Sequence, residues 1–151
     1  MYRIKTSRFG AQSHVKWDCK YHVIITPKYR KKILYGQVRK RVGEILRTLS
    51  QQKQVNILEG FACEDHVHMV LAIPPKYSIA MIIGFLKGKS AIQVHREFAR
   101  HYKNYHGKNF WSRGNFVSTV GLDEEIIKTY VRNQEQQDRQ TEGLQMDMRW
   151  S

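Results

Sequence analysis

Cys63-Glu-Asp-His-Val-His-Met-Val-Leu-Ala-Ile73 is the stretch of sequence on which the fold prediction rests. Successive side chains of an extended strand point to opposite faces, so His66 and His68 project to the same side. The opposite side carries four aliphatic residues: Val67, Met69, Leu71 and Ile73. Burial of that side would hold the two imidazoles on a rigid element. The pattern predicts a pair of nitrogen donors for a metal ion, although a His-x-His pair on a strand can also be structural or merely exposed.

The whole chain is strongly basic. Its 151 residues include 26 lysines and arginines against 13 acidic residues, a formal net charge of +13. This surplus favours a polyanionic partner, either nucleic acid or an anionic membrane surface. The membrane is disfavoured, since no apolar run approaches the roughly 20 residues that span a bilayer, and the N-terminus lacks a signal-peptide hydrophobic region. We expect a cytoplasmic protein with no membrane partner and no small-molecule cofactor, whose two cysteines stay as thiols.

The length and a hydrophobic content of 41% predict a single domain over residues 1–151, with a basic arm at 1–14 and a polar tail at 141–151. Alternation predicts a strand from Val15 to Thr26, ended by Pro27, with His22 on its polar face. His22 could neighbour the histidine pair if the two strands pair; the alternative is an ordinary half-buried histidine. The other expected elements are helices over 37–52 and 78–98, strands over 55–60 and 110–120, and a last helix from about 121.

This order of elements predicts an α+β fold of ferredoxin-like or RRM-like type. Such a fold has a four-stranded antiparallel sheet with helices on one face, here with an additional C-terminal helix. Its first and third strands are central and adjacent, so the histidine pair would lie in the middle of the sheet.

Basic residues gather in three places. Lys28, Tyr29, Arg30, Lys31 and Lys32 place four cations around one aromatic ring, Arg39 lies on the outer face of the first helix, and Lys87 and Lys89 flank a glycine in the second. Cations interleaved with a ring suit a phosphate backbone and an unpaired base. We predict nucleic-acid contacts at these residues; the alternative is an ordinary solvated surface.

Tyr130 and Gln134 are four residues apart, so on the last helix they share a face. If that face packs over the histidine side of the sheet, His66, His68 and Gln134 become three neutral ligands that leave a metal ion its full charge and open positions. Tyr130 would then attack a phosphate and form a phosphotyrosine, which keeps the bond energy for rejoining without ATP. The alternative is a packed ring with its hydroxyl at the surface.

Seven blocks resemble the HUH single-tyrosine transposases of the simplest bacterial insertion sequences, over about residues 15 to 138. They are Thr26-Pro-Lys-Tyr-Arg30, His66-Val-His-Met69, Ile73-Pro-Pro-Lys-Tyr-Ser78, Leu86-Lys-Gly-Lys-Ser-Ala91, Phe110-Trp111, Val117-Ser-Thr-Val-Gly121, and Tyr130 with Gln134. The resemblance implies cleavage of single-stranded DNA through a 5′-phosphotyrosine, recognition of imperfect hairpins, Mg²⁺ or Mn²⁺ as cofactor, and a homodimer. It also implies that Tyr130 and His66 can come from different chains.

Imidazole ligands suit Mn²⁺ better than Mg²⁺, so we expect tighter binding of Mn²⁺. Three alternatives remain open on the sequence. The chain could be a domesticated nuclease of the same type that acts on chromosomal palindromic repeats. It could be a basic nucleic-acid-binding module with structural histidines. Finally, Cys63, His66 and His68 could hold a structural zinc ion, although a fourth ligand is not evident.

Overall fold

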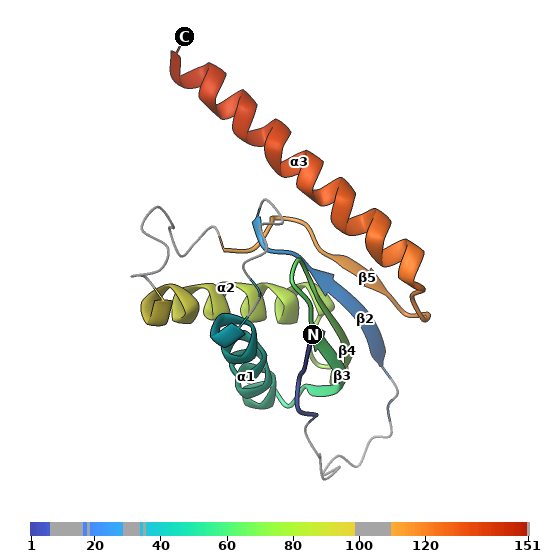
Figure 1. The fold of residues 1–151 in the computed structure, drawn as a ribbon. Coiled ribbons are helices and arrows are strands. Elements are labelled where there is room, and N and C mark those ends of the chain that lie inside the picture. Colours follow the sequence, from blue (N-terminus) through green and yellow to red (C-terminus); the bar gives the residue numbers. More distant parts are fainter. Residues whose placement is uncertain (7–16, 18, 29–33, 35, 99–109, 151) are drawn as a thin grey trace.

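A five-stranded antiparallel sheet forms the centre of the protein (Figure 1). The structure is a computed structural model that describes residues 1–6, 17, 19–28, 34, 36–98 and 110–150. Side chains are described as far as residue 140. The strands are β1 (Tyr2–Arg3), β2 (Lys20–Ile25), β3 (Asn56–Ala62), β4 (Val67–Ala72) and β5 (Phe116–Ser118). The helices are α1 (Gly36–Gln52), α2 (Ile79–Phe98) and α3 (Glu124–Trp150).

The strand order is β1-β3-β4-β2-β5, and every neighbouring pair is antiparallel. Without β1, the remaining order β3-β4-β2-β5 is that of a ferredoxin-like sheet, so the predicted fold class is confirmed. β2 and β4 are adjacent, as expected for the strands that carry His22 and His68.

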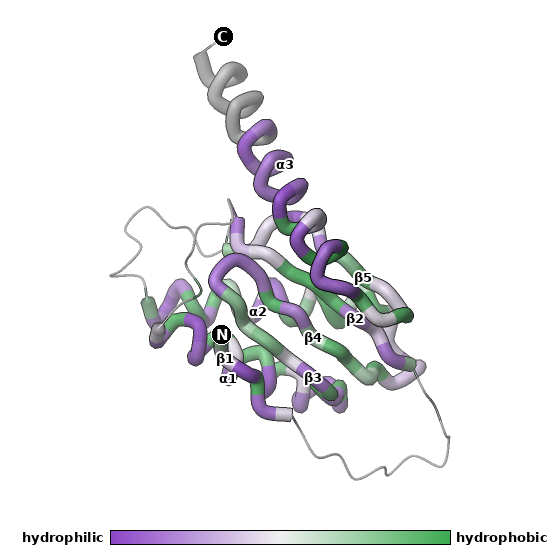
Figure 2. Tube along the Cα trace, turned by 45° about the vertical axis from the view of Figure 1, so that its right-hand side comes forward, coloured by the Kyte–Doolittle hydropathy of each residue, from purple (hydrophilic) through white to green (hydrophobic). Residues whose placement is uncertain are grey.

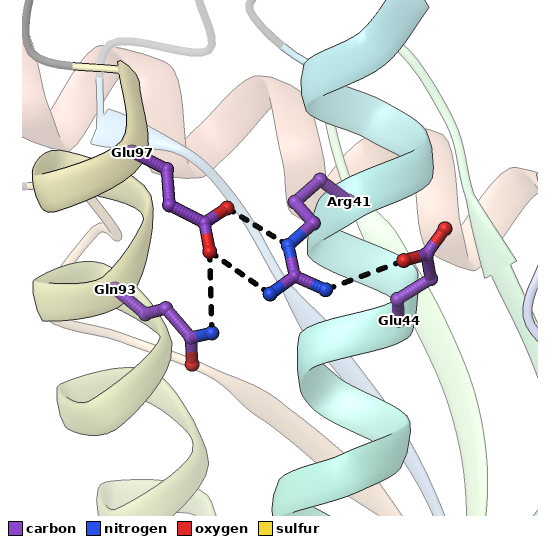
Figure 3. A network of polar contacts seen from close by, with 4 residues as sticks. All are labelled: Arg41, Glu44, Gln93 and Glu97. Atoms are coloured by element: carbon purple, nitrogen blue, oxygen red, sulfur yellow. Dashed lines mark hydrogen bonds and ion pairs between the residues drawn. The ribbon is translucent and has the colours of Figure 1, made fainter.

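One face of the sheet forms the main core with α1 and α2. Val23 and Ile25 of β2 and Val67, Met69 and Leu71 of β4 are buried there, which confirms the aliphatic side predicted for the histidine strand. Ser78 caps α2, since its hydroxyl accepts a hydrogen bond from the amide of Met81 at 3.1 Å. The Arg41 guanidinium of α1 joins the two helices by donating to both carboxylate oxygens of Glu97, at 2.8 and 2.9 Å (Figure 3).

The N-terminal residues contribute a fifth strand that the sequence pattern did not predict. Within the segment expected to be a basic arm, β1 pairs with the edge of β3, and Ile4 is 1% exposed in the main core. This N-terminal segment packs closely against two glycines. A Cβ added at Gly43 would lie 2.8 Å from the Tyr2 ring, and a Cβ added at Gly60 would lie 2.8 Å from the Ile4 side chain. The division into domain, arm and tail otherwise stays a prediction.

Three expected elements have different bounds. The strand expected from Val15 to Thr26 is regular only over β2, since Trp17 and Cys19 are not in a strand; residues 15, 16 and 18 lie outside the described part. The strand expected over 110–120 is regular only in β5. Its earlier part is joined to the chain after β2 by an isolated β-bridge between Pro27 and Trp111, and the Ser112 hydroxyl donates to the carbonyl of Pro27. The last helix begins at Glu124 and continues to Trp150, so the backbone of residues 141–150, expected to be a polar tail, is helical.

The face opposite α1 and α2 is partly covered by α3, which crosses it beside β5 and β2 (Figure 2). Ile24 points to this face and is fully buried outside the main core cluster, and Val131 of α3 is 3% exposed. Both sides of β2 are therefore buried. In the described part of the chain, no helix has the length and apolar character that would let it cross a membrane.

Candidate active site

His68 lies within β4, and its ring faces away from the main core. Its Nε2 lies 3.4 Å from Nδ1 of His22 on β2, with the ring centroids 5.7 Å apart. The expected proximity of these two histidines is thus confirmed. Burial lowers the pKa of His68, and the neighbouring His22 and His66 lower it further. The His68 imidazole is therefore kept neutral, which is the form that binds a metal ion.

His66 lies just before β4, with a side chain that is 16% exposed. Its Nδ1 is 2.8 Å from a carboxylate oxygen of Asp65. Burial by itself lowers the pKa of His66, but interactions with Asp65 and Cys63 outweigh it and raise the pKa to about 9. The His66 ring is therefore protonated at neutral pH in the metal-free protein, and a metal ion would have to displace the proton on Nε2. A carboxylate on Nδ1 fixes the ring orientation and directs Nε2 towards a ligand, an arrangement typical of metal-binding histidines. The sequence pattern singled out the histidine and missed the adjacent aspartate.

Tyr130 belongs to the same face of the sheet as His68. Directly opposed residues of antiparallel strands point to one face, and Ile24 of β2 is paired with His68 on one side and Phe116 of β5 on the other. The ring of Phe116 contacts the ring of Tyr130, with 5.5 Å between centroids. The expectation that the tyrosine helix packs over the histidine side of the sheet is therefore met.

The phenol nevertheless does not contact the histidines within one chain. β2 separates β4 from β5, so the backbones of His68 and Phe116 are roughly 10 Å apart. Among the described residues, neither Tyr130 nor Gln134 has a hydrogen bond or ring contact with His66 or His68. The Tyr130 hydroxyl is buried without a hydrogen-bond partner in this part of the chain. Burial and the negative charge of Asp138 raise its pKa to about 12, so the phenol is neutral in this arrangement.

Gln134 is held by polar contacts that the sequence pattern did not indicate. Its side-chain nitrogen lies 3.5 Å from a carboxylate oxygen of Asp138, whose other oxygen accepts a hydrogen bond from the Ser112 hydroxyl at 2.5 Å. Gln134 and Asp138 are each 7% exposed. A Cβ at Gly114 would lie 2.7 Å from the Gln134 amide oxygen. The amide oxygen of Gln134 therefore needs a glycine at position 114, and Asp138 orients the amide from the next turn of α3.

The basic residues predicted to contact DNA fall into different surroundings. The Lys87 ammonium donates hydrogen bonds to the carbonyl oxygens of Arg113 and Gly114 at 3.2 and 3.1 Å, so it supports the segment beside Gln134. Lys89 is exposed, whereas Lys28 and Arg39 are half-buried. Tyr29, Arg30, Lys31 and Lys32 lie outside the described residues. The DNA contacts of all these residues stay predictions.

Three side chains of this face carry atoms that can bind a divalent cation, although they are not gathered into one site within the chain. The imidazoles of His66 and His68 supply two nitrogen donors, and Gln134 would supply an amide oxygen. Histidine, cysteine and acidic residues do not form a group of three or more that could hold a metal in the described part of the chain. The structural zinc site considered for Cys63, His66 and His68 is therefore not supported.

Known proteins resemble this chain over most of its length. The profile of the family described as "Transposase IS200 like" matches residues 15–134. The transposases of insertion sequence IS200 from Salmonella typhimurium and Salmonella typhi are each 43% identical over 132 residues, which cover 87% of this chain and 87% of each relative. The ISDra2 transposase TnpA of Deinococcus radiodurans is 28% identical over 78% of this chain and 85% of its own length.

Solved structures agree with these sequence matches. A crystal structure from Deinococcus radiodurans, described as a transposase, has a TM-score of 0.73 and 26% identity over 83% of this chain and 98% of that chain. A REP-associated tyrosine transposase bound to a REP hairpin has a TM-score of 0.50 and 10% identity over 80% of this chain and 68% of that one, a likeness that shows the fold alone. On the family profile and the 43% identity, the chain belongs to the IS200-like transposase family.

Proposed function

We propose that this transposase cleaves and rejoins single-stranded DNA through a covalent bond to Tyr130. The single observation that supports the proposal most is the common face: His68, Ile24 and Phe116 form one row across three strands, and Tyr130 packs on the end of that row. A rigid sheet that carries two imidazoles, with a phenol on a helix over the same face, would supply both the ligands of a cation and a nucleophile.

His66, His68 and Gln134 would hold the divalent ion, which when bound polarises the scissile phosphate. Because Nδ1 of His66 is occupied by Asp65, Nε2 is its ligand atom. The metal is Mg²⁺ or Mn²⁺, and the imidazoles favour Mn²⁺. In the reaction, the Tyr130 oxygen forms a bond to phosphorus and loses its proton, while the bond from phosphorus to the 3′ oxygen breaks and that oxygen leaves as a hydroxyl. Reversal by another 3′-hydroxyl rejoins the strand.

The protein would act as a homodimer in which Tyr130 of one chain serves the histidines of its partner. Two features support this arrangement. Within one chain, β2 lies between the strand of His68 and the strand that Tyr130 contacts, and a phenol whose pKa is raised to about 12 is not activated where it lies. The substrate is single-stranded DNA with imperfect hairpins. For the REP-associated transposase of similar fold, a bound hairpin is part of the solved structure. The cytoplasmic location stays a prediction.

A labelled hairpin-containing strand incubated with the protein and Mn²⁺ tests this function. The expected product is a protein–DNA species that survives denaturant, requires the metal ion, and is lost when His66 and His68 are both replaced by alanine. Lys128→Ala is the control, because its exposed ammonium is paired with Glu124 on the surface of α3. If the histidine double variant gave as much product as the wild type, the chain would act on DNA without this site, and a basic binding module with structural histidines would be the better description.

A further inference from the structure

The row of residues that contains His68 continues in the other direction, towards the β1 edge of the sheet. Phe61 of β3 is paired with His68, and Arg3 of β1 is paired with Phe61. Paired residues share a face, so Arg3, Phe61 and His68 point to the same side. With strands about 4.8 Å apart, Arg3 is roughly 10 Å from His68 along the backbone row. In Figure 2, α3 crosses this face beside β2 and β5 and leaves β3 to the side.

Phe61 is a half-buried ring that takes no part in the main core. It is absent from the core cluster and from the partly buried hydrophobic residues packed against it. Both of its pairing partners are polar, Arg3 on one side and His68 on the other. An aromatic ring on an open sheet face, between an imidazole and a guanidinium, is the kind of surface on which an unpaired base stacks.

A basic hollow of about 380 Å³ lies at the β1 edge of the sheet, between Arg3, which ends the row, and Arg47 of α1, a helix on the other face. It is lined by Arg3, Ile4, Lys5, Thr6 and Arg47. Among the described residues, none of its three cationic side chains has an acidic partner. Nε of Arg47 is buried without a hydrogen-bond partner in the same part of the chain. Unpaired guanidinium groups at a concave surface favour a phosphate group.

The hollow is held in place by the packing of the N-terminus. The amide of Ile4 donates to the carbonyl of Gly60 at 2.8 Å, and Ile4 is in the main core. Tyr2 lies against Gly43 on α1, one helical turn from Arg47. Glu59, two residues from Phe61 on the same strand, is paired with Val70, so its backbone lies in the next row of the same face, further from His66 than the row of Phe61. Its negative charge acts on His68, whose pKa it raises against the larger effect of burial. It disfavours phosphates in that row and favours a path along Arg3 and Phe61.

We infer that single-stranded DNA reaches the histidines along this row, with one base stacked on Phe61 and its backbone phosphates bound by Arg3 and the basic hollow. This inference rests on the proposed function, since it describes how the same site holds its substrate. It assigns binding roles to Phe61, Arg3 and Arg47, and none of the three takes part in the chemical step.

Binding of a short fluorescent oligothymidine, which has no hairpin, tests the inference. Phe61→Ala is expected to weaken binding about 5- to 150-fold, the range found when a stacked aromatic is removed, and Phe61→Trp is expected to restore it. Arg3→Gln and Arg47→Gln are each expected to reduce the dependence of log affinity on log salt by about 0.7 for each phosphate that the variant no longer binds. Arg47→Lys keeps the charge and should keep the slope.

Two matched controls separate these effects from general ones. Leu58→Ala removes an exposed apolar side chain from the same strand, outside the row. Arg41→Gln removes one charge from the same helix as Arg47, but from a guanidinium already paired with Glu97 and Glu44 (Figure 3). Neither control should change affinity or salt slope as the row variants do.

The results distinguish failure of this inference from failure of the proposed function. The inference is overturned if Phe61→Ala and Arg3→Gln, both folded by circular dichroism, bind the oligothymidine as the wild type does while the wild type still forms the covalent product with a hairpin strand. If the wild type forms no covalent product, the proposed function fails. In that case, loss of oligothymidine binding in Phe61→Ala and Arg3→Gln, but not in the two controls, would still support binding of DNA along this row.

Discussion

Phe116 and His68 are paired with the same residue, Ile24, from opposite sides of β2. This relationship puts the ring that contacts Tyr130 and the imidazole proposed as a metal ligand on one face, two strands apart. The sheet therefore fixes the histidines, whereas the helix that carries the phenol is positioned through the segment around β5. Each part of this arrangement can be tested separately.

The carboxylate of Asp65 is expected to govern metal binding at His66. Asp65→Asn removes the negative charge from Nδ1 of His66, and loss of such a partner typically weakens metal binding about 10- to 100-fold. Calorimetric titration with Mn²⁺ measures the change. Glu64→Gln is the matched control, because it removes one negative charge from the neighbouring, exposed position. Equal affinities for the two variants would mean that Asp65 does not orient the ligand.

Gly114 and Gly88 are expected to respond in opposite ways to alanine. At Gly114 the new Cβ would lie 2.7 Å from the buried Gln134 amide oxygen, so the substitution should displace Gln134 and destabilise the protein by about 1 kcal/mol. At Gly88, in the middle of α2, nothing lies within 4 Å, and alanine should stabilise by about 0.5 to 1 kcal/mol. Thermal unfolding compares the two, and a stabilised Gly114→Ala would contradict the described packing of α3.

The phenol of Tyr130 is expected to ionise only at high pH in the metal-free protein. A tyrosine in an unfolded chain has a pKa near 10, whereas burial and Asp138 raise the pKa of Tyr130 to about 12. Folding thus keeps the proton on the phenol, so this contribution to stability is complete below about pH 10 and is lost as the pH rises towards 12. The difference in tyrosinate absorbance between the wild type and Tyr130→Phe measures the pKa.

Asp138→Asn should move that ionisation to lower pH, since it removes one of the two causes of the raised pKa, but not below 10, because the ring stays buried. An unchanged titration in Asp138→Asn would show that the carboxylate does not act on the phenol.

A mixture of two inactive variants is expected to regain activity. Tyr130→Phe lacks the nucleophile, and His66→Ala with His68→Ala lacks the cation site. If the phenol of one chain serves the histidines of its partner, each mixed dimer contains one complete site out of two. Random exchange of equal amounts makes about half of the dimers mixed, so the mixture should form about one quarter of the covalent product that the same amount of wild type forms. Complete absence of product from a mixture shown to exchange subunits would mean that both groups must come from one chain.

The sequence predicted the parts of the fold that have strong periodicity. Alternation over β2 and β4 identified both strands and the proximity of His22 to His68, and Ser78 marked the start of α2. It could not predict β1, because two paired residues show no period and their place depends on glycines at 43 and 60. The length of α3 was also missed, since the apolar residues of its last turns alternate with polar ones, a spacing that does not indicate a helix: Leu144, Met146, Met148 and Trp150.

In the candidate site, residue type identified His66, His68, Tyr130 and Gln134, because these groups have recognisable chemistry at a recognisable spacing. Their supporting residues could not be found in the same way. Ser112 and Asp138 are 26 residues apart in the chain and meet only because α3 packs on the segment before β5. The sequence likewise did not indicate that the Lys87 ammonium donates to the backbone carbonyls of Arg113 and Gly114.

The most direct test of the central claim is the covalent product of Tyr130→Phe with a labelled hairpin strand and Mn²⁺. The substitution removes one oxygen from a ring held by Phe116, so the variant should fold and bind the hairpin as the wild type does. Tyr21→Phe, in β2, is the control with the same change and should keep full product. We expect Tyr130→Phe to give no denaturant-resistant protein–DNA species. A species formed by this variant at the wild-type level would contradict the assignment of Tyr130 as the nucleophile.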